Sequence, residues 1–482
     1  MNNNQAALLY EAFECALNNI LTRVSASTHL DDGSIFSESY ASLQKPSLKL
    51  AIAYSGGLDS SVLLHLAHVF SIKYGCELYA FHIHHGISAN ADAWLIHCEA
   101  QCQQLDIQFD AQKITLEKST KSGVEEAARI GRYAALGALC RKHRASILLT
   151  AHHRDDQAET VLLQLLRGSG VAGLSGMDSE NVAPDLLGDA ELRMARPLLA
   201  TSRAELAVFA VRNNILFVED ESNSDLRYAR NALRHTVMPA LEQAFPGFQE
   251  RLGRTAQHAQ SAQRLLIALA EQDLQNCQDG DCLDVRQLRQ LSSDRAYNLL
   301  RYWFCSRGVR MPSTAWLSEM LVQLLEAKDD AQLCVTHADC HIRRYRDRIF
   351  MTPKLDEDGL SVAPASFRWN GELQIMFPAY SGVMHFEVSA QGVDADWLRN
   401  EKLTIRLRSG GERLKLAVNR PTKSLKYHYQ AANVPAWERM RLPIITASDG
   451  TVLFASGVGM HCHFFQDAPG QKISLRWQAD NI

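Results

Sequence analysis

Six consecutive residues form the part of this chain best suited to bind a phosphate group: Ser55, Gly56, Gly57, Leu58, Asp59 and Ser60. The apolar run 48–54 before them has the length of a strand, and the pattern of 61–70 after them predicts a helix. Adjacent glycines let the backbone approach an anion, and the N–H groups of a first helical turn point at it. Asp59 stands where a Walker loop carries its lysine, so it can recruit Mg²⁺ to the phosphates. The alternative is a glycine-rich turn without a ligand.

Polar side chains gather at the ends of two further predicted strands. The strand 77–83 ends in a histidine-rich segment, and the strand 145–150 is followed by a segment rich in histidine and acid. These segments contain His82, His84 and His85 in the first case, and His152, His153, Asp156 and Glu159 in the second. Because ligands of open parallel sheets bind beyond the carboxyl ends of the strands, the three strand ends predict one cleft.

Asp156 and Glu159 are three residues apart at a predicted helix start, so both side chains project to one side. Beside a nucleotide loop they can hold an ammonium group or remove its proton. The alternative is that they only cap the helix dipole. For the histidines, packing or nucleotide contacts are favoured over a metal cluster.

Two sets of arginines have helical spacing. Arg129 and Arg132 share a face of the helix predicted at 124–143, where they either face the phosphate cleft or form surface ion pairs. Arg227, Arg230 and Arg234 fall on one face of a polar block and suit the phosphates of a nucleic acid. A solvated basic helix is the alternative for the second set.

The charge is unevenly distributed. The net charge of −4 argues against a general nucleic-acid coat protein. Residues 399–441, however, hold eleven Lys and Arg against three Glu. Such a cluster suits a polyanionic partner, although a solvated basic face gives the same pattern.

A length of 482 residues predicts two or three domains. Strands and helices alternate as in a parallel α/β sheet until about Pro239, helices follow to about Lys328, and short strands dominate from about Asp356. We also expect a strand at 340–352 and an acidic surface loop at 178–191. The predicted divisions are an N-terminal extension at 1–47, an ATP-binding α/β domain at 48–238, a mainly helical domain at 239–355 and a basic, β-rich domain at 356–482.

Cysteine and hydropathy patterns bear on the compartment. No apolar run approaches the 18 residues of a membrane span, and the N-terminus lacks the features of a signal peptide. The eleven cysteines include no C-x-x-C pair. We therefore expect a cytoplasmic protein with reduced thiols and no membrane contact.

From about residue 48 onward the chain resembles the bacterial tRNA(Ile)-lysidine synthetases of the PP-loop ATP pyrophosphatase superfamily. The glycine loop alone indicates only the superfamily. The family resemblance depends on further motifs along the chain. They are His82-x-His84-His85-Gly86, Glu126-x-x-Arg129-x-x-Arg132-Tyr133, His152-His153-x-Asp155-Asp156-Gln157-x-Glu159, Arg196-Pro197-Leu198-Leu199, Tyr228-x-Arg230-Asn231-x-x-Arg234, Arg406-x-Arg408 and Lys423-x-x-Lys426. Glu221, which replaces a frequent proline, and the long N-terminal segment are minor departures.

The resemblance implies an ATP-dependent ligase. Members join free L-lysine to carbon 2 of the wobble cytosine, position 34, in a tRNA(Ile) with a CAU anticodon, and they release AMP and pyrophosphate. The lysidine formed switches decoding from AUG to AUA. By position, Arg132 and His152 are expected to offset charge on the α-phosphate, and Asp156 and Glu159 to grip lysine and take its proton. Asp59 is expected to act on the phosphates through Mg²⁺.

The tRNA is expected to contact the helical and C-terminal domains. The basic residues predicted to bind it are Arg227, Arg230, Arg234, Arg406, Arg408, Arg413, Lys423 and Lys426. Both a monomer and a homodimer fit the sequence.

The main alternative is a PP-loop tRNA thiolase, which adenylates a base but delivers sulfur. Such enzymes generally need paired or catalytic cysteines, whereas Cys98 and Cys102 are expected on a helix away from the strand ends. An amide-forming relative would bring a glutaminase module, and Asn2 stands where such a module would need a nucleophilic cysteine. A non-catalytic RNA-binding protein would not need an intact loop and acid pair.

Overall fold

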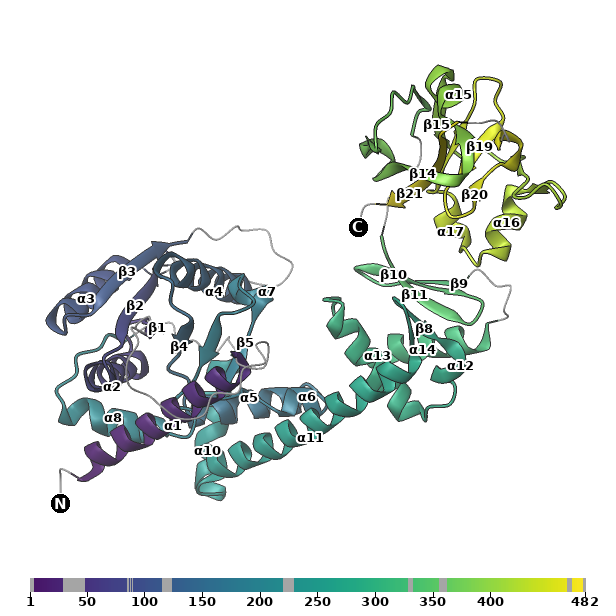
Figure 1. Cartoon of the computed structure of the whole chain (residues 1–482). Coiled ribbons are helices and arrows are strands. Elements are labelled where there is room, and N and C mark those ends of the chain that lie inside the picture. The colour runs from purple at the N-terminus through teal and green to yellow at the C-terminus, as the bar shows by residue number, and fades with distance from the viewer. Residues whose placement is uncertain are drawn as a thin grey trace, which may run out of the picture. The chain divides into compact units, whose positions relative to one another are not determined.

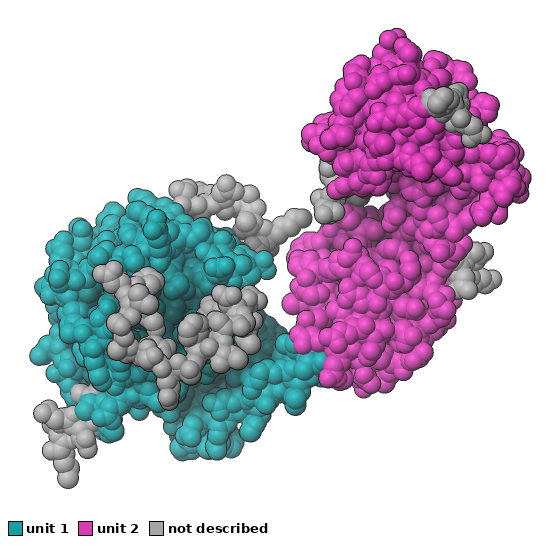
Figure 2. Space-filling model, in the orientation of Figure 1, with its two compact units in different colours: residues 1–268 teal, residues 269–482 magenta. Residues whose placement is uncertain are grey.

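The computed structural model describes residues 4–28, 48–84, 86, 88, 90–114, 124–219, 229–327, 333–354, 362–465 and 470–479. Contacts divide the chain into two compact units, residues 1–268 and residues 269–482 (Figure 2). The division falls within the long helix α11 (Phe248–Cys277). The predicted domain limits at 238 and 355 are not tested by this division and stay predictions.

The first unit is built on a six-stranded sheet with the order β3-β2-β1-β4-β6-β5 (Figure 1). All neighbours pair in parallel except β5, which runs antiparallel to β6. The strands are β1 (Lys49–Ala53), β2 (Glu77–His84), β3 (Gln108–Lys113), β4 (Ile147–Leu149), β5 (Glu180–Val182) and β6 (Arg193–Ala195). The parallel α/β prediction and its three strands are confirmed, and β2 and β4 flank β1 on either side. Their carboxyl ends therefore meet at one edge.

Helices cover both faces of this sheet because each face of a parallel sheet is apolar. One core joins the sheet to α1, α2, α3 and α8, and includes Phe13, Leu63 and Leu206. The other joins it to α4 and α7, and includes Leu136 and Leu187. The helices are α1 (Asn4–Thr28), α2 (Leu58–Tyr74), α3 (Ala91–Gln104), α4 (Val124–His143), α5 (Arg154–Leu166), α6 (Val171–Leu174), α7 (Pro184–Leu187), α8 (Arg203–Arg212), α9 (Ala229–Ala232) and α10 (Met238–Ala244).

The N-terminal segment contributes to the first unit. Phe13, Leu17 and Ile20 on α1 are at most 1 % exposed in the core that contains α2 and α8. Arg23 pairs with Glu180 on β5 at 3.0 Å. The acidic stretch 178–191 is predicted as a surface loop, but in the structure it contains the strand β5 and the short helix α7. No helix among the described residues is long and apolar enough to cross a membrane.

The second unit begins with helices packed on a small antiparallel sheet of the order β7-β8-β11-β10-β9. Its elements are β7 (Gln278–Asp279), β8 (Cys282–Asp284), α12 (Val285–Leu288), α13 (Ser293–Ser306), α14 (Thr314–Glu326), β9 (Leu333–Thr336), β10 (Cys340–Tyr345) and β11 (Arg348–Pro353). The single strand expected at 340–352 is wrong. The segment is a hairpin, and Arg346 takes the positive φ of 56° that its tight turn requires.

The basic tail is β-rich, as predicted. One sheet has the order β12-β15-β18-β19-β20, a second β13-β14-β21, and β16 pairs with β17. The strands are β12 (Ala365–Phe367), β13 (Gln374–Phe377), β14 (Gly382–Asp394), β15 (Leu403–Leu407), β16 (Arg413–Leu414), β17 (Lys423–Ser424), β18 (Pro443–Thr446), β19 (Val452–Ala455), β20 (Gly459–Met460) and β21 (Lys472–Ala479). Short α-helices lie between these strands in the described part of the tail, namely α15 (Ala395–Asn400), α16 (Leu425–Ala431) and α17 (Ala436–Arg439).

Two glycines of α4 give a matched test of how this helix packs. A Cβ at Gly137 would lie 1.9 Å from the Leu187 carbonyl oxygen of α7, whereas a Cβ at Gly131 would meet only the flexible end of Ile114 at 3.3 Å. We expect Gly137→Ala to destabilise the contact by about 1–3 kcal/mol through overpacking. Gly131→Ala should instead keep or raise helix stability by up to about 1 kcal/mol. Hydrogen-exchange mass spectrometry of α4 and α7 peptides measures both, and unchanged protection in Gly137→Ala would contradict this packing.

Candidate active site

The glycine loop joins β1 to α2 with a backbone that favours an anion. Gly56 has a φ of +84°, which L side chains rarely adopt. Gly57 is the N-cap of α2, and no side chain caps the amides of the first turn. The hydroxyls of Ser60 and Ser61 instead donate to the carbonyl oxygens of Gly57 and Gly56, at 3.0 and 3.2 Å. These bonds hold the loop while the first-turn N–H groups stay available to phosphate.

Two segments pack directly against the loop. The Val218 amide donates to the Gly56 carbonyl oxygen at 2.9 Å, and a Cβ at Gly56 would lie 2.8 Å from Cys98 Sγ. The expectation that Cys98 lies away from the strand ends is therefore wrong: α3 brings its sulfur beneath the loop. Burial raises the pKa of both Cys98 and Cys102 to about 12, so neither is an activated thiol at neutral pH.

Asp59 lies in the first turn of α2. One of its oxygens, Oδ2, lies 3.6 Å from His153 Nε2, and the other, Oδ1, lies 3.9 Å from Arg203 Nε. Oδ1 is buried and accepts no hydrogen bond within the described part of the chain. An unsatisfied carboxylate oxygen beside a phosphate loop fits Mg²⁺, which typically takes one or two carboxylates together with substrate phosphates. Among the described residues no cluster of three metal-ligating side chains occurs.

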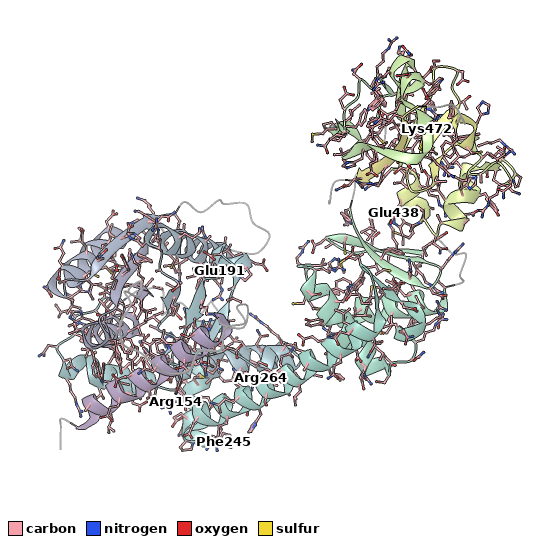
Figure 3. All side chains as sticks on the ribbon, in the orientation of Figure 1. Arg154, Glu191, Phe245, Arg264, Glu438 and Lys472 are labelled. Atoms are coloured by element: carbon pink, nitrogen blue, oxygen red, sulfur yellow. The ribbon has the colours of Figure 1, made fainter. Side chains whose placement is uncertain are left out.

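The start of α5 places both predicted carboxylates in the interior. His153 is the N-cap, its ring accepts the Asp156 amide, and its own amide donates to Asp156 Oδ2 at 3.1 Å. Asp156 is 9 % exposed and Glu159 only 1 %. Arg154, the first residue of α5, is labelled in Figure 3 and pairs with Glu205 of α8 at 3.0 Å. Buried carboxylates need partners, since an unpaired buried charge is costly.

Arg230 and Arg234 supply those partners. Arg230 donates to Glu159 Oε2 at 2.7 Å and to Asp156 Oδ1 at 3.0 Å. Arg234 donates to Glu159 Oε1 at 2.6 Å and to Asp156 Oδ1 at 3.2 Å. Two carboxylates are thus balanced by two guanidinium groups. Arg234 lies in a π-helical turn, Leu233–Val237, an irregularity often found at functional sites.

The surroundings of the two adjacent histidines shift their pKa values in opposite directions. Burial lowers the pKa of His153, but its hydrogen bond to Asp59 and the charge of Asp156 outweigh burial and raise it above the ordinary value. Burial lowers the pKa of His152 to about 4, and neighbouring arginine charges add to this effect. His152 is therefore neutral near pH 7, with Nδ1 2.9 Å from the Thr150 hydroxyl. A neutral imidazole meets an anion by donating a hydrogen bond.

Asp156 responds to the same neighbours. Burial acts to raise its pKa, but the positive charges of His153 and Arg230 lower it below the ordinary range. Asp156 is thus held as a carboxylate. The pair can accept an ammonium group only in place of, or beside, the arginines that now bind it.

The arginines of the predicted motifs lie in different surroundings. Arg132 lies on the exposed side of α4, and its role at the α-phosphate stays a prediction. Arg129 and the buried Arg196 lie near enough to His152 to lower its pKa. Arg227 lies outside the described residues.

The remaining predicted basic residues lie in the tail. Arg406 is half-buried, and its Nη1 binds Glu412 Oε1 at 3.0 Å. Arg413 is exposed and donates to the Thr422 carbonyl oxygen at 3.1 Å. Arg408 lines a pocket with Lys426, and Lys423 lines a second pocket. Their contact with tRNA stays a prediction.

A parallel sheet whose first strand leads through a glycine loop to an uncapped helix defines an ATP-binding α/β enzyme domain. Family models agree: a PP-loop domain matches residues 33–241, a TilS substrate binding domain matches 283–350, and a TilS substrate C-terminal domain matches 403–477. The chain belongs to the tRNA(Ile)-lysidine synthase family.

Full-length relatives support this membership. A tRNA(Ile)-lysidine synthase of Burkholderia pseudomallei is 40 % identical over 466 residues, covering 90 % of this chain and 94 % of the relative. Those of Alkalilimnicola ehrlichii and Nitrosomonas europaea are 39 % and 36 % identical, covering 85 % and 91 % of this chain and 90 % and 93 % of theirs. The family prediction is confirmed, and the thiolase alternative has less support.

Substitutions of the two adjacent loop glycines test the fold of the loop and its binding of ATP separately. Gly56→Ala meets both a positive φ and the Cys98 sulfur, whereas a Cβ at Gly57 has no neighbour closer than 3.6 Å. We expect Gly56→Ala to distort the loop and lower its thermal stability. Gly57→Ala should fold normally but weaken ATP binding at least tenfold, because its Cβ enters the space a phosphate would take. Calorimetric ATP titration and thermal melting measure both effects, and normal ATP binding by Gly57→Ala would place the phosphates elsewhere.

Proposed function

We propose that this enzyme joins the ε-amine of free L-lysine to carbon 2 of the wobble cytosine in a tRNA(Ile) with a CAU anticodon. The observation that carries the proposal is the pair of buried carboxylates, Asp156 and Glu159, linked through His153 to Asp59 of the ATP loop. An activating site and an amine-binding site thus share one edge of the sheet. Membership of the tRNA(Ile)-lysidine synthase family supports the same chemistry.

The first half-reaction activates the base. Oxygen 2 of cytosine attacks the α-phosphorus of ATP, the bond to the β-phosphate oxygen breaks, and pyrophosphate leaves. The loop amides and the helix start of α2 bind the phosphates, and the neutral His152 donates a hydrogen bond to the α-phosphate in this proposal. Asp59, through Oδ1, which accepts no hydrogen bond from the described residues, would hold Mg²⁺, and the ion would supply positive charge against the phosphates.

The second half-reaction replaces AMP by lysine. The lysine amine has a pKa of about 10.4 in water, so at neutral pH it must lose a proton before it attacks carbon 2. Asp156, held ionised, binds the ammonium group, and Glu159 accepts the proton. The new carbon–nitrogen bond forms as the bond from carbon 2 to the adenylated oxygen breaks, and AMP leaves with that oxygen.

The arginines connect lysine binding to tRNA binding. Arg230 and Arg234, which the sequence suggests for tRNA phosphates, pair with the carboxylates in the structure. A guanidinium that donates its hydrogen bonds to a carboxylate cannot donate the same bonds to a phosphate. We infer that tRNA phosphates draw these arginines away and free the carboxylates for lysine. The exposed basic residues of the tail would bind the rest of the tRNA.

Compartment and assembly stay predictions. A cytoplasmic location fits the need for free lysine, ATP and tRNA. Sedimentation of the purified chain would decide between a monomer and a homodimer.

The direct test supplies purified protein with ATP, Mg²⁺, labelled lysine and either a CAU-anticodon tRNA(Ile) or the same tRNA with a GAU anticodon. Label should enter only the first RNA, with AMP formed in equal amount. Asp59→Asn should abolish both label and AMP. If AMP forms while label never enters RNA, another nucleophile takes the place of lysine and the proposal fails.

Glu159→Gln separates the two half-reactions. The amide keeps most of the shape and one of the two acceptor oxygens that Arg230 and Arg234 use, and it is a far weaker base, so lysine transfer should fall by about 10²-fold or more. Adenylation, followed as tRNA-dependent exchange of pyrophosphate into ATP, should remain within a few-fold of the wild type. Loss of both activities in a folded variant would make Glu159 part of the adenylation site instead.

A further inference from the structure

A pocket of about 360 Å³ in the tail combines aromatic and basic side chains. Tyr427 and His428 of α16 line it together with Arg420 and Lys423. Tyr427 is 52 % exposed, although it is one of the largest side chains of this surface. A lone exposed aromatic residue needs no explanation, but one that lines a cationic pocket does.

The Tyr427 ring is held by its neighbours. Lys423 Nζ lies 5.2 Å from the ring centroid, and the His428 ring meets it edge-on at 5.8 Å with an interplanar angle of 82°. His428 is itself anchored, because its Nε2 donates to the Leu414 carbonyl oxygen at 3.0 Å. Unpaired bases stack on a fixed, solvent-accessible aromatic ring that has a cation nearby.

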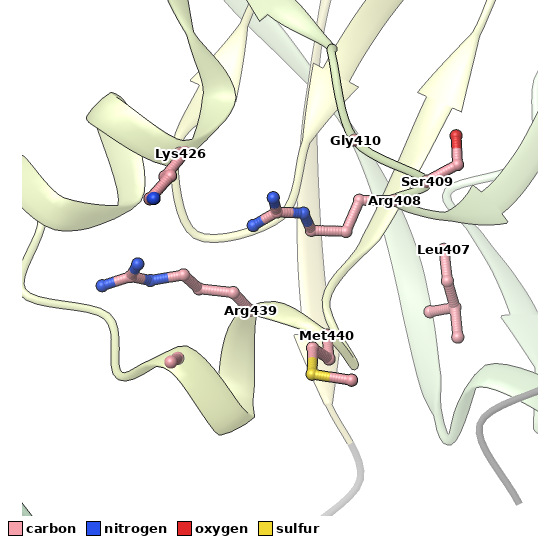
Figure 4. A pocket seen from close by; sticks show the side chains of 8 residues that line it. Leu407, Arg408, Ser409, Gly410, Lys426, Arg439 and Met440 are labelled. Atoms are coloured by element: carbon pink, nitrogen blue, oxygen red, sulfur yellow. The ribbon is translucent and has the colours of Figure 1, made fainter. Parts of the chain in front are cut away.

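A second pocket, of about 430 Å³, opens beside the same helix. Figure 4 shows the charged ends of Arg408, Lys426 and Arg439 gathered there, from the loop after β15, from α16 and from α17. Arg439 is only 6 % exposed and is anchored by hydrogen bonds to the Val434 carbonyl oxygen and the Tyr345 hydroxyl at 2.7 and 2.9 Å.

These three cations lack negative partners in the described part of the chain. None of them forms an ion pair with a described carboxylate. Glu412, the acid nearest to this loop in sequence, is already occupied: it accepts the Ser409 amide at 2.7 Å and Arg406 at 3.0 Å. The positive charges of Arg408 and Arg439 also reach the buried phenol of Tyr429, where they act against the burial that raises its pKa to about 12. Three unneutralised cations in a cavity suit a phosphate group.

We propose that α16 and its flanking loops bind one unpaired nucleotide of the RNA substrate. The base stacks on Tyr427, and a neighbouring phosphate enters the pocket of Arg408, Lys426 and Arg439. Lys426 and Tyr427 are consecutive residues, so the two pockets suit a phosphate and a base close together on a single strand. The proposal rests on the proposed function, because it assigns part of the tRNA to this surface.

The test compares Tyr427→Ala with Tyr427→Phe in the full-length protein. Because the side chain is half-exposed, both variants should melt like the wild type. Loss of one stacking interaction should weaken tRNA binding roughly fivefold or more in Tyr427→Ala, while Tyr427→Phe stays within about twofold of the wild type. Wild-type affinity in Tyr427→Ala, or an equal loss in both variants, would overturn the stacking.

Charge variants test the phosphate. Lys426→Gln and Arg408→Gln should each lower the salt slope of tRNA binding by about one. Arg476→Gln on β21, a residue paired with Glu387 outside both pockets, is the control and should leave the slope unchanged. Unchanged slopes in both pocket variants would overturn the phosphate assignment.

The source of the nucleotide is decided by a tRNA that lacks its single-stranded 3′ end. If the Tyr427→Ala effect disappears with this RNA, the base belongs to the 3′ end; if it persists, the base belongs to a loop. Both results support an unpaired base. The proposed function is judged separately, by wild-type tRNA binding and lysine incorporation: if these succeed while Tyr427→Ala binds normally, only the present inference fails.

Discussion

The burial of two carboxylates at the start of α5 is the constraint on which the first unit depends. Asp156 and Glu159 are removed from water, and such charges persist only when opposite charges accompany them. Arg230 and Arg234 provide the balance from a segment more than 70 residues away in sequence. The same ion cluster orders that segment and keeps Asp156 ionised. In the proposed reaction, Asp156 is therefore already a carboxylate when a substrate ammonium group takes the place of the arginines.

His153 joins this cluster to the ATP loop. Its ring lies 3.3 Å from Asp156 Oδ2 and 3.6 Å from Asp59 Oδ2, so one buried imidazole lies between these two carboxylates. The pKa of His153 is raised because its negative neighbours outweigh its burial, whereas His152 next to it is neutral. The pKa values of two adjacent histidines are thus shifted in opposite directions. The difference arises because burial, helped by neighbouring arginines, lowers the pKa of His152, whereas at His153 the nearby carboxylates outweigh burial.

Local sequence patterns predicted the helices and strands better than they predicted which of these elements contact one another. The loop, the helix 124–143 and the three strands were readable because a buried parallel strand leaves an apolar run and a helix leaves a 3.6-residue period. The hairpin at 340–353 was missed because its turn, Arg346 and Asp347, lacks the glycine that usually marks one. Cys98 was misplaced because helical periodicity gives no information about which loop a helix end approaches.

By itself the sequence determined the family and predicted the phosphate loop and the acid pair, since all three depend on residue type and short spacing. Tertiary structure alone decided which groups meet. Arg230 and Arg234 are four residues apart and Asp156 and Glu159 are three apart, so each pair can share one helical face, yet the arginine pattern suits a tRNA phosphate equally well, because both partners are anions. Likewise, no spacing reveals that Arg408, Lys426 and Arg439 converge on one pocket. Charge complementarity is a property of distances in space, and only folding sets those distances.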